Sequence, residues 1–298
     1  MSDIKIKVFY SVAKHLSFTK ASEELFLSQP AVSKNIKELE IEYGARLFDR
    51  KGNRIELTQS GNILFDYAEQ ILSIYKKIDF DLNIIKQKFS GNLSLGTSTT
   101  IGQYLLPVVL AHFSRNFPEI QVSLLNANTQ KIEKSIIDKK IELGIVEGKS
   151  KNKQIKYLPF IKDEIVAIAH TSQKISQYDE INLEELKKLP IVLRETGSGT
   201  LEVIKFELAK HHIQLKDLNI KMFLGNTESI KSFLAHSNSL GFVSVASVSK
   251  EISKGEFKIL EIQHFNISRT FNFIYLQGVL GGNAKLFMDF TKKHYNLK

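Results

Sequence analysis

Residues 17–61 read SFTKASEELFLSQPAVSKNIKELEIEYGARLFDRKGNRIELTQSG, and the order of the elements that this stretch predicts decides the fold. Two short helical patterns precede a third helix that begins at Ser28-Gln29-Pro30, and a charged hairpin with Gly52-Asn53 at its tip follows it. Pro30 suits the first turn of a helix, where its missing N–H has no intrahelical partner, and Ser28 is a good N-cap. This succession is typical of a winged helix-turn-helix that binds duplex DNA.

The third helix separates into two faces by spacing alone. Apolar side chains recur every three to four residues and should pack on the preceding helices; they are Val32, Ile36, Leu39 and Tyr43. The opposite face is polar and basic, as a major groove requires. The residues expected to contact DNA are Ser28, Gln29, Pro30, Ser33, Lys34 and Lys37, with Arg50, Lys51 and Arg54 of the hairpin lying along the phosphates. For a single member a solvated surface charge is the simpler interpretation, but the ordered set favours DNA.

The stretch resembles the LysR-type transcriptional regulators. The matching residues are Ser17-Phe18-Thr19, Ala21, Leu25, residues 28–33, Ile36, Leu39-Glu40, Gly44, Leu47-Phe48, Arg50, Leu57-Thr58 and Gly61. Ser22 and Lys34 depart from the family pattern, and an ammonium at Lys34 lacks the planar fork that reads guanine in a bidentate manner. Further matches extend over essentially the whole chain, at residues 91–96, Leu106-Pro107, Phe117-Pro118 and residues 240–242.

Composition limits the alternatives. A chain of 298 residues with 43% hydrophobic and 24% charged residues is typical of a globular protein of two or three domains, and the absence of cysteine excludes disulfides and thiolate metal sites. The net charge of +9 suits a nucleic-acid partner, but residues 1–90 hold 14 Lys and Arg against 12 Asp and Glu, so only the local basic face identifies the DNA-binding part. With no signal peptide or membrane span apparent, we expect a cytoplasmic protein without a membrane partner.

Residues 58–89 contain no proline and show a seven-residue apolar repeat. The predicted seam comprises Leu64, Ala68, Ile71, Tyr75, Ile78, Leu82 and Ile85. A helix lying on its own domain is one interpretation; the family resemblance favours a linker helix that pairs with a second subunit. The resemblance also implies homodimers that often form tetramers, and it is compatible with contact to RNA polymerase. A dimer suits a site with two-fold symmetry.

Beyond residue 91 predicted strands and helices alternate, among them a helix over residues 101–117 and strands over residues 165–170 and 271–276, and this alternation predicts an α/β fold with parallel strands. The resemblance implies two Rossmann-like subdomains joined by two crossing strands, as in periplasmic solute-binding proteins. The expected fold class is thus α/β with an all-α-type winged helix-turn-helix domain and a long linker helix. The expected boundaries are 1–60 for DNA binding, 61–90 for the linker and 91–298 for effector binding, with subdomain I at 91–162 and 266–298 and subdomain II at 163–265.

Loops that leave strand ends and enter helices are rich in small and hydroxyl-bearing residues. Ligands of open α/β sheets gather there, where helix N-termini offer N–H groups, so a small anion or carboxylate is the expected effector. The candidate residues are Ser98, Thr99, Thr100, Glu147, Arg194, Gly197, Ser198, Gly199, Thr200 and Thr227. For each hydroxyl alone, helix capping is the simpler explanation, and Arg194 could pair with an anion or with Glu195.

Enzyme alternatives fit less well. Residues 144–150 imitate a phosphate-binding loop but are one residue short between the glycines, and Ser198 lies outside the elbow motif of a hydrolase. The eight histidines are scattered, so we expect no metal site, no cofactor and no catalytic residue. Residues 98–107 and 194–200 resemble the branch that regulates sulfur assimilation or carbon fixation. The preferred interpretation is an effector-responsive DNA-binding regulator; a solute-binding protein is second and an enzyme third.

Overall fold

The computed structural model describes residues 4–51, 54–85, 89–149, 151–278 and 280–296. The chain divides into two compact units, Met1–Lys88 and Phe89–Lys298. Within the described ranges, no helix is long and apolar enough to cross a membrane.

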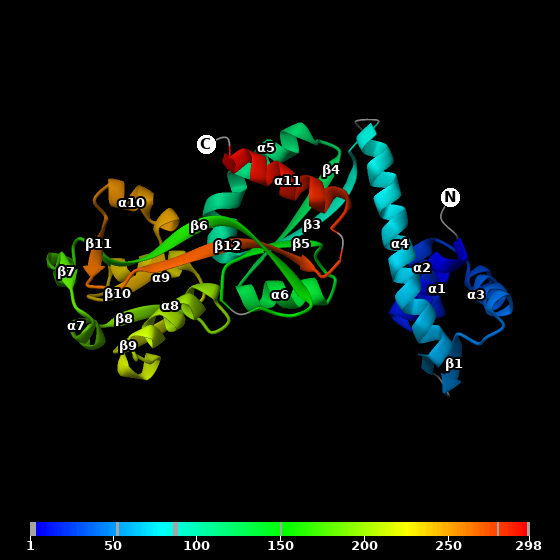
Figure 1. Ribbon diagram of the computed structural model, residues 1–298, viewed down its shortest axis with the longest axis horizontal. Helices are drawn as coiled ribbons and strands as arrows, with labels where there is room; N and C mark the ends of the chain where they lie inside the picture. Colours follow the sequence, from blue (N-terminus) through cyan, green and yellow to red (C-terminus); the bar gives the residue numbers. More distant parts are fainter. Residues whose placement is uncertain (1–3, 52–53, 86–88, 150, 279, 297–298) are drawn as a thin grey trace. The chain divides into compact units, whose positions relative to one another are not determined.

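The first unit is a winged helix-turn-helix followed by one long helix (Figure 1). Its elements are α1 (Ile4–His15), α2 (Phe18–Leu25), α3 (Gln29–Tyr43), β1 (Phe48–Lys51), β2 (Arg54–Leu57) and α4 (Gln59–Ile85). The Ser28 side chain accepts a hydrogen bond from the Ala31 N–H, and α3 ends at Gly44, which has a φ of 61°. The predicted order of elements is confirmed, with Ser28 as the N-cap of α3.

The core of this unit is formed by the apolar stripes of its first three helices. Val32, Ile36 and Leu39 are buried as predicted, against Phe9 and other residues of α1. Tyr43 is not part of the stripe, since 52% of it is exposed. Tyr43 is the last residue of α3, where the chain turns away at Gly44, and this position carries its side chain past the edge of the core.

Polar side chains beside this core link the first two helices, α1 and α2. Ser11 donates a hydrogen bond to the Glu24 carboxylate, and Lys14 and His15 lie beside the same carboxylate. The hydrogen bond from Ser11 is the main reason that the pKa of Glu24 lies below its usual value.

The second unit is built on a ten-stranded mixed sheet, in which eight strands follow the order β4-β3-β5-β12-β6-β10-β8-β9. Its strands are β3 (Gly91–Ser98), β4 (Ile120–Ala127), β5 (Leu143–Val146), β6 (Ile155–His170), β7 (Glu180–Ile181), β8 (Ile191–Arg194), β9 (Ile220–Leu224), β10 (Leu240–Ser244), β11 (Phe257–Ile262) and β12 (Ile267–Leu276). Strands β3, β4 and β5 are parallel to one another, as are β8, β9 and β10. The prediction of parallel strands therefore holds for these six strands, while β6 and β12 are antiparallel to each other and to the neighbours β10, β11 and β5.

Helices pack against the sheet in both subdomains, and each subdomain has a large hydrophobic core of its own (Figure 1). They are η1 (Ile101–Leu105), α5 (Leu106–Asn116), α6 (Thr129–Ile137), η2 (Lys174–Gln177), α7 (Leu183–Lys188), α8 (Gly199–Lys210), η3 (Leu215–Asp217), α9 (Thr227–Ala235), η4 (Val245–Ser247), α10 (Ser249–Ser253) and α11 (Gly282–Asn296). One helix was expected over residues 101–117, but η1 is a π-helix. Pro107 lies in the first turn of α5 and cannot donate a hydrogen bond to the preceding turn, which accounts for the change of pitch.

Strands β6 and β12 run through both subdomains and pair with each other from Ile155 to Ile165 of β6. The sequence predicted only their distal portions, residues 165–170 and 271–276. Pro159 concealed the rest of β6, because proline is excluded from regular central strands. A bulge in the register between Phe271 and Asn272 accommodates it. Side chains of β6 and β12 therefore lie where the two subdomains meet.

Candidate functional site

The exposed face of α3 is the candidate nucleic-acid interface. All six residues predicted to contact DNA from this helix and its cap are exposed, namely Ser28, Gln29, Pro30, Ser33, Lys34 and Lys37. The Lys34 side chain is 78% exposed and only 3.9 Å from Glu38. Such an exposed pair contributes little to stability, so Lys34 is free to turn to a phosphate or a base. Ser28 caps α3, whereas the other five side chains are exposed and take no part in the core of the unit.

The wing places three further basic residues in its strands. Arg50 pairs with Ile55 across the hairpin, and Lys51 pairs with Arg54. Gly52 and Asn53, predicted to form the tip, lie outside the described residues, as do the side chains of Arg50, Lys51 and Arg54. The backbone thus forms the predicted hairpin stem on either side of this pair.

Helix α4 has two apolar faces. Ala68 is fully buried, and Leu64 and Ile71 pack with it against the core of the same unit. These three predicted seam residues therefore contact the chain's own helices, because α1 lies alongside α4 (Figure 1). Of the other seam residues, Tyr75 is half-buried and Ile78 is exposed, while the side chains of Leu82 and Ile85 lie outside the described residues. A second face leaves large apolar side chains exposed: Ile63, Tyr67, Ile74 and Ile78.

In the second unit, two of the predicted hydroxyl residues, Ser98 and Thr200, meet around one carboxylate, that of Glu147, which is 2% exposed. Ser98, at the end of β3, donates a hydrogen bond to Glu147 Oε2. Thr200, in the first turn of α8, has its Oγ1 atom 3.5 Å from Glu147 Oε1. Glu147 and Ser98 belong to subdomain I and Thr200 to subdomain II, so the two subdomains meet at these side chains.

Arg269 of β12 supplies the positive charge of this cluster. It was not among the site residues predicted from the sequence. Its Nε atom lies 2.7 Å from Asp163 Oδ2 on the adjacent strand β6, and its Nη1 atom lies 3.3 Å from Glu147 Oε1. The same Nη1 donates to Thr200 Oγ1 at 2.8 Å. Arg269 is 3% exposed, so these contacts are shielded from solvent.

Several donors of this cluster lack an internal partner. Arg269 Nη2 and Ser198 Oγ are buried without a hydrogen bond to any described residue, as is Thr99 Oγ1 directly after β3. Ser198 is the N-cap residue of α8, yet its side chain makes no capping bond. The first N–H groups of α8 have no intrahelical acceptor either. Unpaired buried donors are costly, so their concentration at the start of one helix indicates a place for acceptor atoms of a ligand.

The backbones of the two subdomains are in direct contact beside this cluster. Gly199 lies so close to Glu147 that a Cβ atom there would be 2.2 Å from the Glu147 carbonyl oxygen. The Gln130 N–H donates to the Gly197 carbonyl at 3.2 Å, and Asn128 donates to Glu195. Gly197 has a φ of 86°, a conformation that favours glycine. The two predicted glycines, Gly197 and Gly199, therefore allow the two subdomains to approach each other closely.

Arg194 and Thr227 have other surroundings. Arg194 binds Glu195 through Nε at 2.9 Å and donates from Nη2 to the Gly225 carbonyl, so of the two predicted alternatives it takes the Glu195 pair. Its Nη1 atom, however, is buried without a partner in the described part of the chain. Thr227 is buried at the start of α9, outside the contacts around Glu147.

A second contact between the subdomains lies next to Thr227. Tyr104 of η1 donates to Glu228 of α9, and burial together with this bond raises the pKa of Tyr104 far above its usual value. Lys231 lies over the Tyr104 ring and bonds to Glu228 and Glu251. Burial alone lowers the pKa of Lys231, but the two carboxylates outweigh this effect and raise it. Since η1 begins directly after Thr100, the residues that follow β3 are continuous in the chain with this contact.

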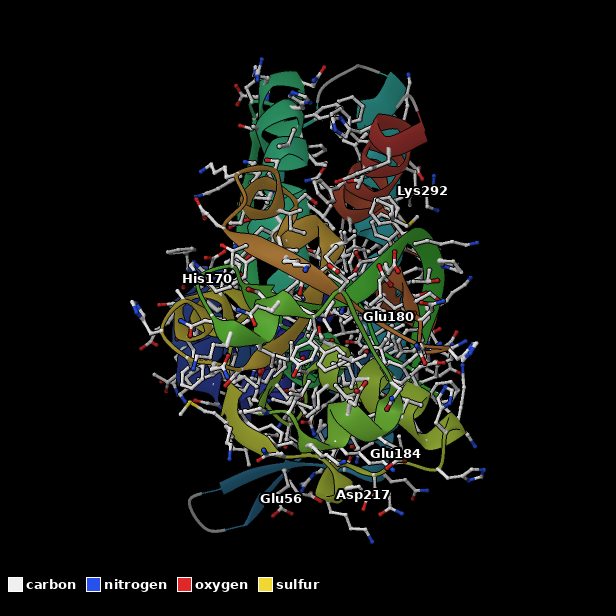
Figure 2. All side chains as sticks on the ribbon, turned by 90° about the vertical axis from the view of Figure 1, so that its left-hand side faces the viewer. Glu56, His170, Glu180, Glu184, Asp217 and Lys292 are labelled. Atoms are coloured by element: carbon white, nitrogen blue, oxygen red, sulfur yellow. The ribbon has the colours of Figure 1, made fainter. Side chains whose placement is uncertain are left out.

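A cavity of about 460 Å³ adjoins the Arg269 cluster. Asp163 and Phe271 line it, and the Arg269 guanidinium lies 5.0 Å from the centre of the Phe271 ring. The remaining walls are mostly apolar and come from both subdomains, with Leu105 on one side and Val245 on the other. In contrast, Glu180, Glu184 and Asp217 are exposed on the surface of subdomain II (Figure 2).

One sequence signal could have revealed Arg269. The residues Phe265, Ile267, Phe271 and Phe273 alternate along the strand and are all buried, and Arg269 falls in the same register. An arginine on the apolar side of a strand requires an anionic partner, because an unpaired buried charge is very costly. Asp163 and Asn128 carry no comparable local signal, since only the tertiary fold brings Asp163 beside Arg269 and Asn128 beside Glu195.

Comparison with known families agrees with both units. Residues 5–62 match the model of the bacterial regulatory helix-turn-helix protein, lysR family, and residues 86–296 match the LysR substrate binding domain. The fold and site together define a DNA-binding transcriptional regulator with an effector-binding domain of two α/β subdomains. The chain belongs to the LysR family of transcriptional regulators.

Individual relatives support this assignment. A probable RuBisCO transcriptional regulator of Thalassiosira pseudonana is 32% identical over 275 residues, covering 91% of this chain and 90% of the relative. The HTH-type transcriptional regulator CysL of Bacillus subtilis is 27% identical and covers 97% of this chain and 96% of its own length. The solved regulatory domain of Synechocystis PCC6803 CcmR, in complex with 2-PG, is 26% identical with a TM-score of 0.62, and the match covers 69% of this chain and 97% of that one. The named relatives are regulators rather than enzymes.

Proposed function

We propose that the exposed face of α3 reads an operator sequence and that the crevice around Glu147 and Arg269 binds a small, acidic effector that modulates this reading. The single observation that carries the effector role is the group of buried, unpaired donors at the start of α8, including Ser198 Oγ and Arg269 Nη2. The complex of the CcmR regulatory domain with 2-PG supports a search for a small molecule in the corresponding domain. The apolar cavity beside Phe271 offers room for its organic part.

The DNA-binding role rests on the exposed polar side chains of α3. Gln29→Ala and Ser33→Ala are expected to relax the sequence preference, with each lost base contact costing about 1–3 kcal/mol at the preferred operator. Arg54→Ala in the wing should weaken all sequences alike and reduce the salt slope of binding by about one unit. Fluorescence anisotropy with the preferred operator, a base-substituted operator and random duplex, each over a range of salt concentrations, separates the two effects. Unchanged preference and unchanged salt slope in all three variants would exclude this interface.

The proposal includes a homodimer formed through α4, with a tetramer and a contact to RNA polymerase as expectations from the family resemblance. The exposed stripe of Ile63, Tyr67, Ile74 and Ile78 is the surface offered for pairing. It replaces the first half of the predicted seam, since Leu64, Ala68 and Ile71 already pack within the unit. A dimer would present two copies of α3 to the two halves of a symmetric operator.

Ile74→Lys with Ile78→Lys is expected to dissociate the dimer, because each ammonium would be buried in an apolar contact at a cost of several kcal/mol. Sedimentation equilibrium measures the mass directly. The matched control is Asn62→Lys with Asp66→Lys, which places two lysines at the same spacing on exposed polar positions of α4 to the side of the stripe. The control should keep the native mass. Equal masses for the two double variants would move the subunit contact away from this stripe.

A further inference from the structure

The start of α8 combines donors that no described residue uses. Ser198 and Arg269 are 4% and 3% exposed, and Ser198 Oγ and Arg269 Nη2 lack partners within the described chain. Arg269 Nη1 donates to Thr200 Oγ1, which places the guanidinium at the first turn of the helix. The free N–H groups of that turn face the same region. Anionic oxygens are the acceptors that such a set of donors requires.

The same place holds a strong acceptor, which a site for a simple anion does not need. Glu147 Oε1 lies 3.3 Å from Arg269 Nη1 and 3.5 Å from Thr200 Oγ1, and Oε2 accepts a hydrogen bond from Ser98. An ionised carboxylate has about four lone-pair positions and no proton to donate. A ligand oxygen that carries no hydrogen would therefore face the lone pairs of Glu147 and could form no hydrogen bond with them.

The charges of the cluster also favour a ligand that can donate a hydrogen bond to Glu147. The one guanidinium of Arg269 faces two carboxylates, those of Glu147 and Asp163, while Arg194 is matched by its own partner Glu195. A fully deprotonated oxyanion adds negative charge to a buried cluster in which carboxylates already outnumber guanidinium groups, and it offers nothing to Glu147. An oxyanion that keeps an O–H can donate to Glu147 while its anionic oxygens accept from Arg269 Nη2 and Ser198.

We propose that this site takes an oxyanion that keeps an O–H of its own, such as hydrogen phosphate, a phosphomonoester monoanion or a 2-hydroxy carboxylate. Glu147 is the residue that discriminates against fully deprotonated oxyanions such as sulfate. This inference rests on the effector role proposed above and names the chemical class of the effector.

Calorimetric titration of the full-length protein with sodium phosphate and sodium sulfate at pH 7 tests this selection. Phosphate is expected to bind about 100-fold more tightly than sulfate, since a charge-assisted bond to Glu147 is gained and a repulsion avoided. Glu147→Gln supplies a donor as well as an acceptor, so sulfate should bind more tightly and the ratio should fall by about tenfold or more. Glu184→Gln, which changes an exposed carboxylate in the first turn of α7, away from the cavity and the cluster, should leave the ratio unchanged.

Ser198→Ala provides a second variant with a different signature. Its hydroxyl serves the anionic oxygens of either ion, so both affinities should fall by about tenfold while their ratio stays the same. The selectivity of the unaltered protein is measured without any substitution, so the test stands even if a variant folds poorly. Equal affinity for phosphate and sulfate, an unchanged ratio in Glu147→Gln, or no binding of phosphate at millimolar concentration would each overturn the proposal.

Succinate, a dicarboxylate without a hydroxyl, separates this inference from the effector role. If succinate binds tightly and loses affinity in Ser198→Ala, the crevice is an effector site but the requirement for an O–H is wrong. If none of the three anions binds and operator affinity is insensitive to all of them, the proposed effector role fails as well.

Discussion

Gly199→Ala is expected to lower effector affinity roughly 5- to 150-fold, although the substitution touches no proposed ligand atom. A Cβ atom at this position would lie 2.2 Å from the Glu147 carbonyl oxygen and 2.7 Å from Thr129 Oγ1. Backbone atoms cannot yield as a flexible side chain does, so the two subdomains must separate locally. Overpacking of this kind costs about 1–3 kcal/mol, which becomes a loss of affinity if the closed arrangement is the one that binds.

Gly225→Ala is the matched control. Gly225 also precedes a helix of subdomain II, but a Cβ atom there would meet nothing within 4 Å. Calorimetry with phosphate should show a large loss for Gly199→Ala and a negligible change for Gly225→Ala, and small-angle scattering should detect opening only in the former. Equal phosphate affinities for the two variants would show that the contact at Gly199 is not needed for binding.

Arg269→Met is expected to destabilise the second unit by about 3–5 kcal/mol, because removing one partner of a buried ion pair leaves an uncompensated charge. Here two carboxylates lose their partner, those of Asp163 and Glu147. Methionine keeps much of the aliphatic length, so the loss reports on charge more than on packing. Urea unfolding of the full chain, followed by a probe in the second unit, measures the effect.

Neutralising the two carboxylates should restore most of this stability. The triple variant Arg269→Met, Glu147→Gln and Asp163→Asn removes all three charges while preserving shape, and buried ion clusters are often replaceable by neutral groups. Arg115→Met, at an exposed position of α5, should change stability by no more than about 0.5 kcal/mol. A triple variant as unstable as Arg269→Met would indicate that packing, rather than charge, makes Arg269 necessary.

The helix-turn-helix was predictable because its signals are local. Ser28 caps the helix that it immediately precedes, and the stripe of Val32, Ile36 and Leu39 lies within a single helix. Tyr43 followed the same period but lies at the end of α3, where the helix has already passed its neighbours. Periodicity therefore identified the face, while the extent of the core depended on where the packing partner ends.

The long helix α4 shows a different limit. A seven-residue repeat indicates that an apolar face is covered, but it does not say by what. The structure places Ala68 against the helices of the same chain and leaves Ile63, Tyr67 and Ile74 exposed. The interpretation of a helix lying on its own domain, considered from the sequence, holds for the first turns of α4, and the exposed stripe remains the proposed subunit contact.

The sequence by itself determined the α/β class of the second unit and the hydroxyl-bearing loops, because alternation and turn chemistry operate over a few residues. Only the tertiary structure decided which of these loops share a site. Thr200 is 53 residues from Glu147 in the chain, and Arg269 is 106 residues from Asp163. The long strands β6 and β12 bring these groups together across two subdomains, and burial then makes each charge depend on the others. No local pattern encodes such a dependence, since it arises from distance and desolvation in the folded chain.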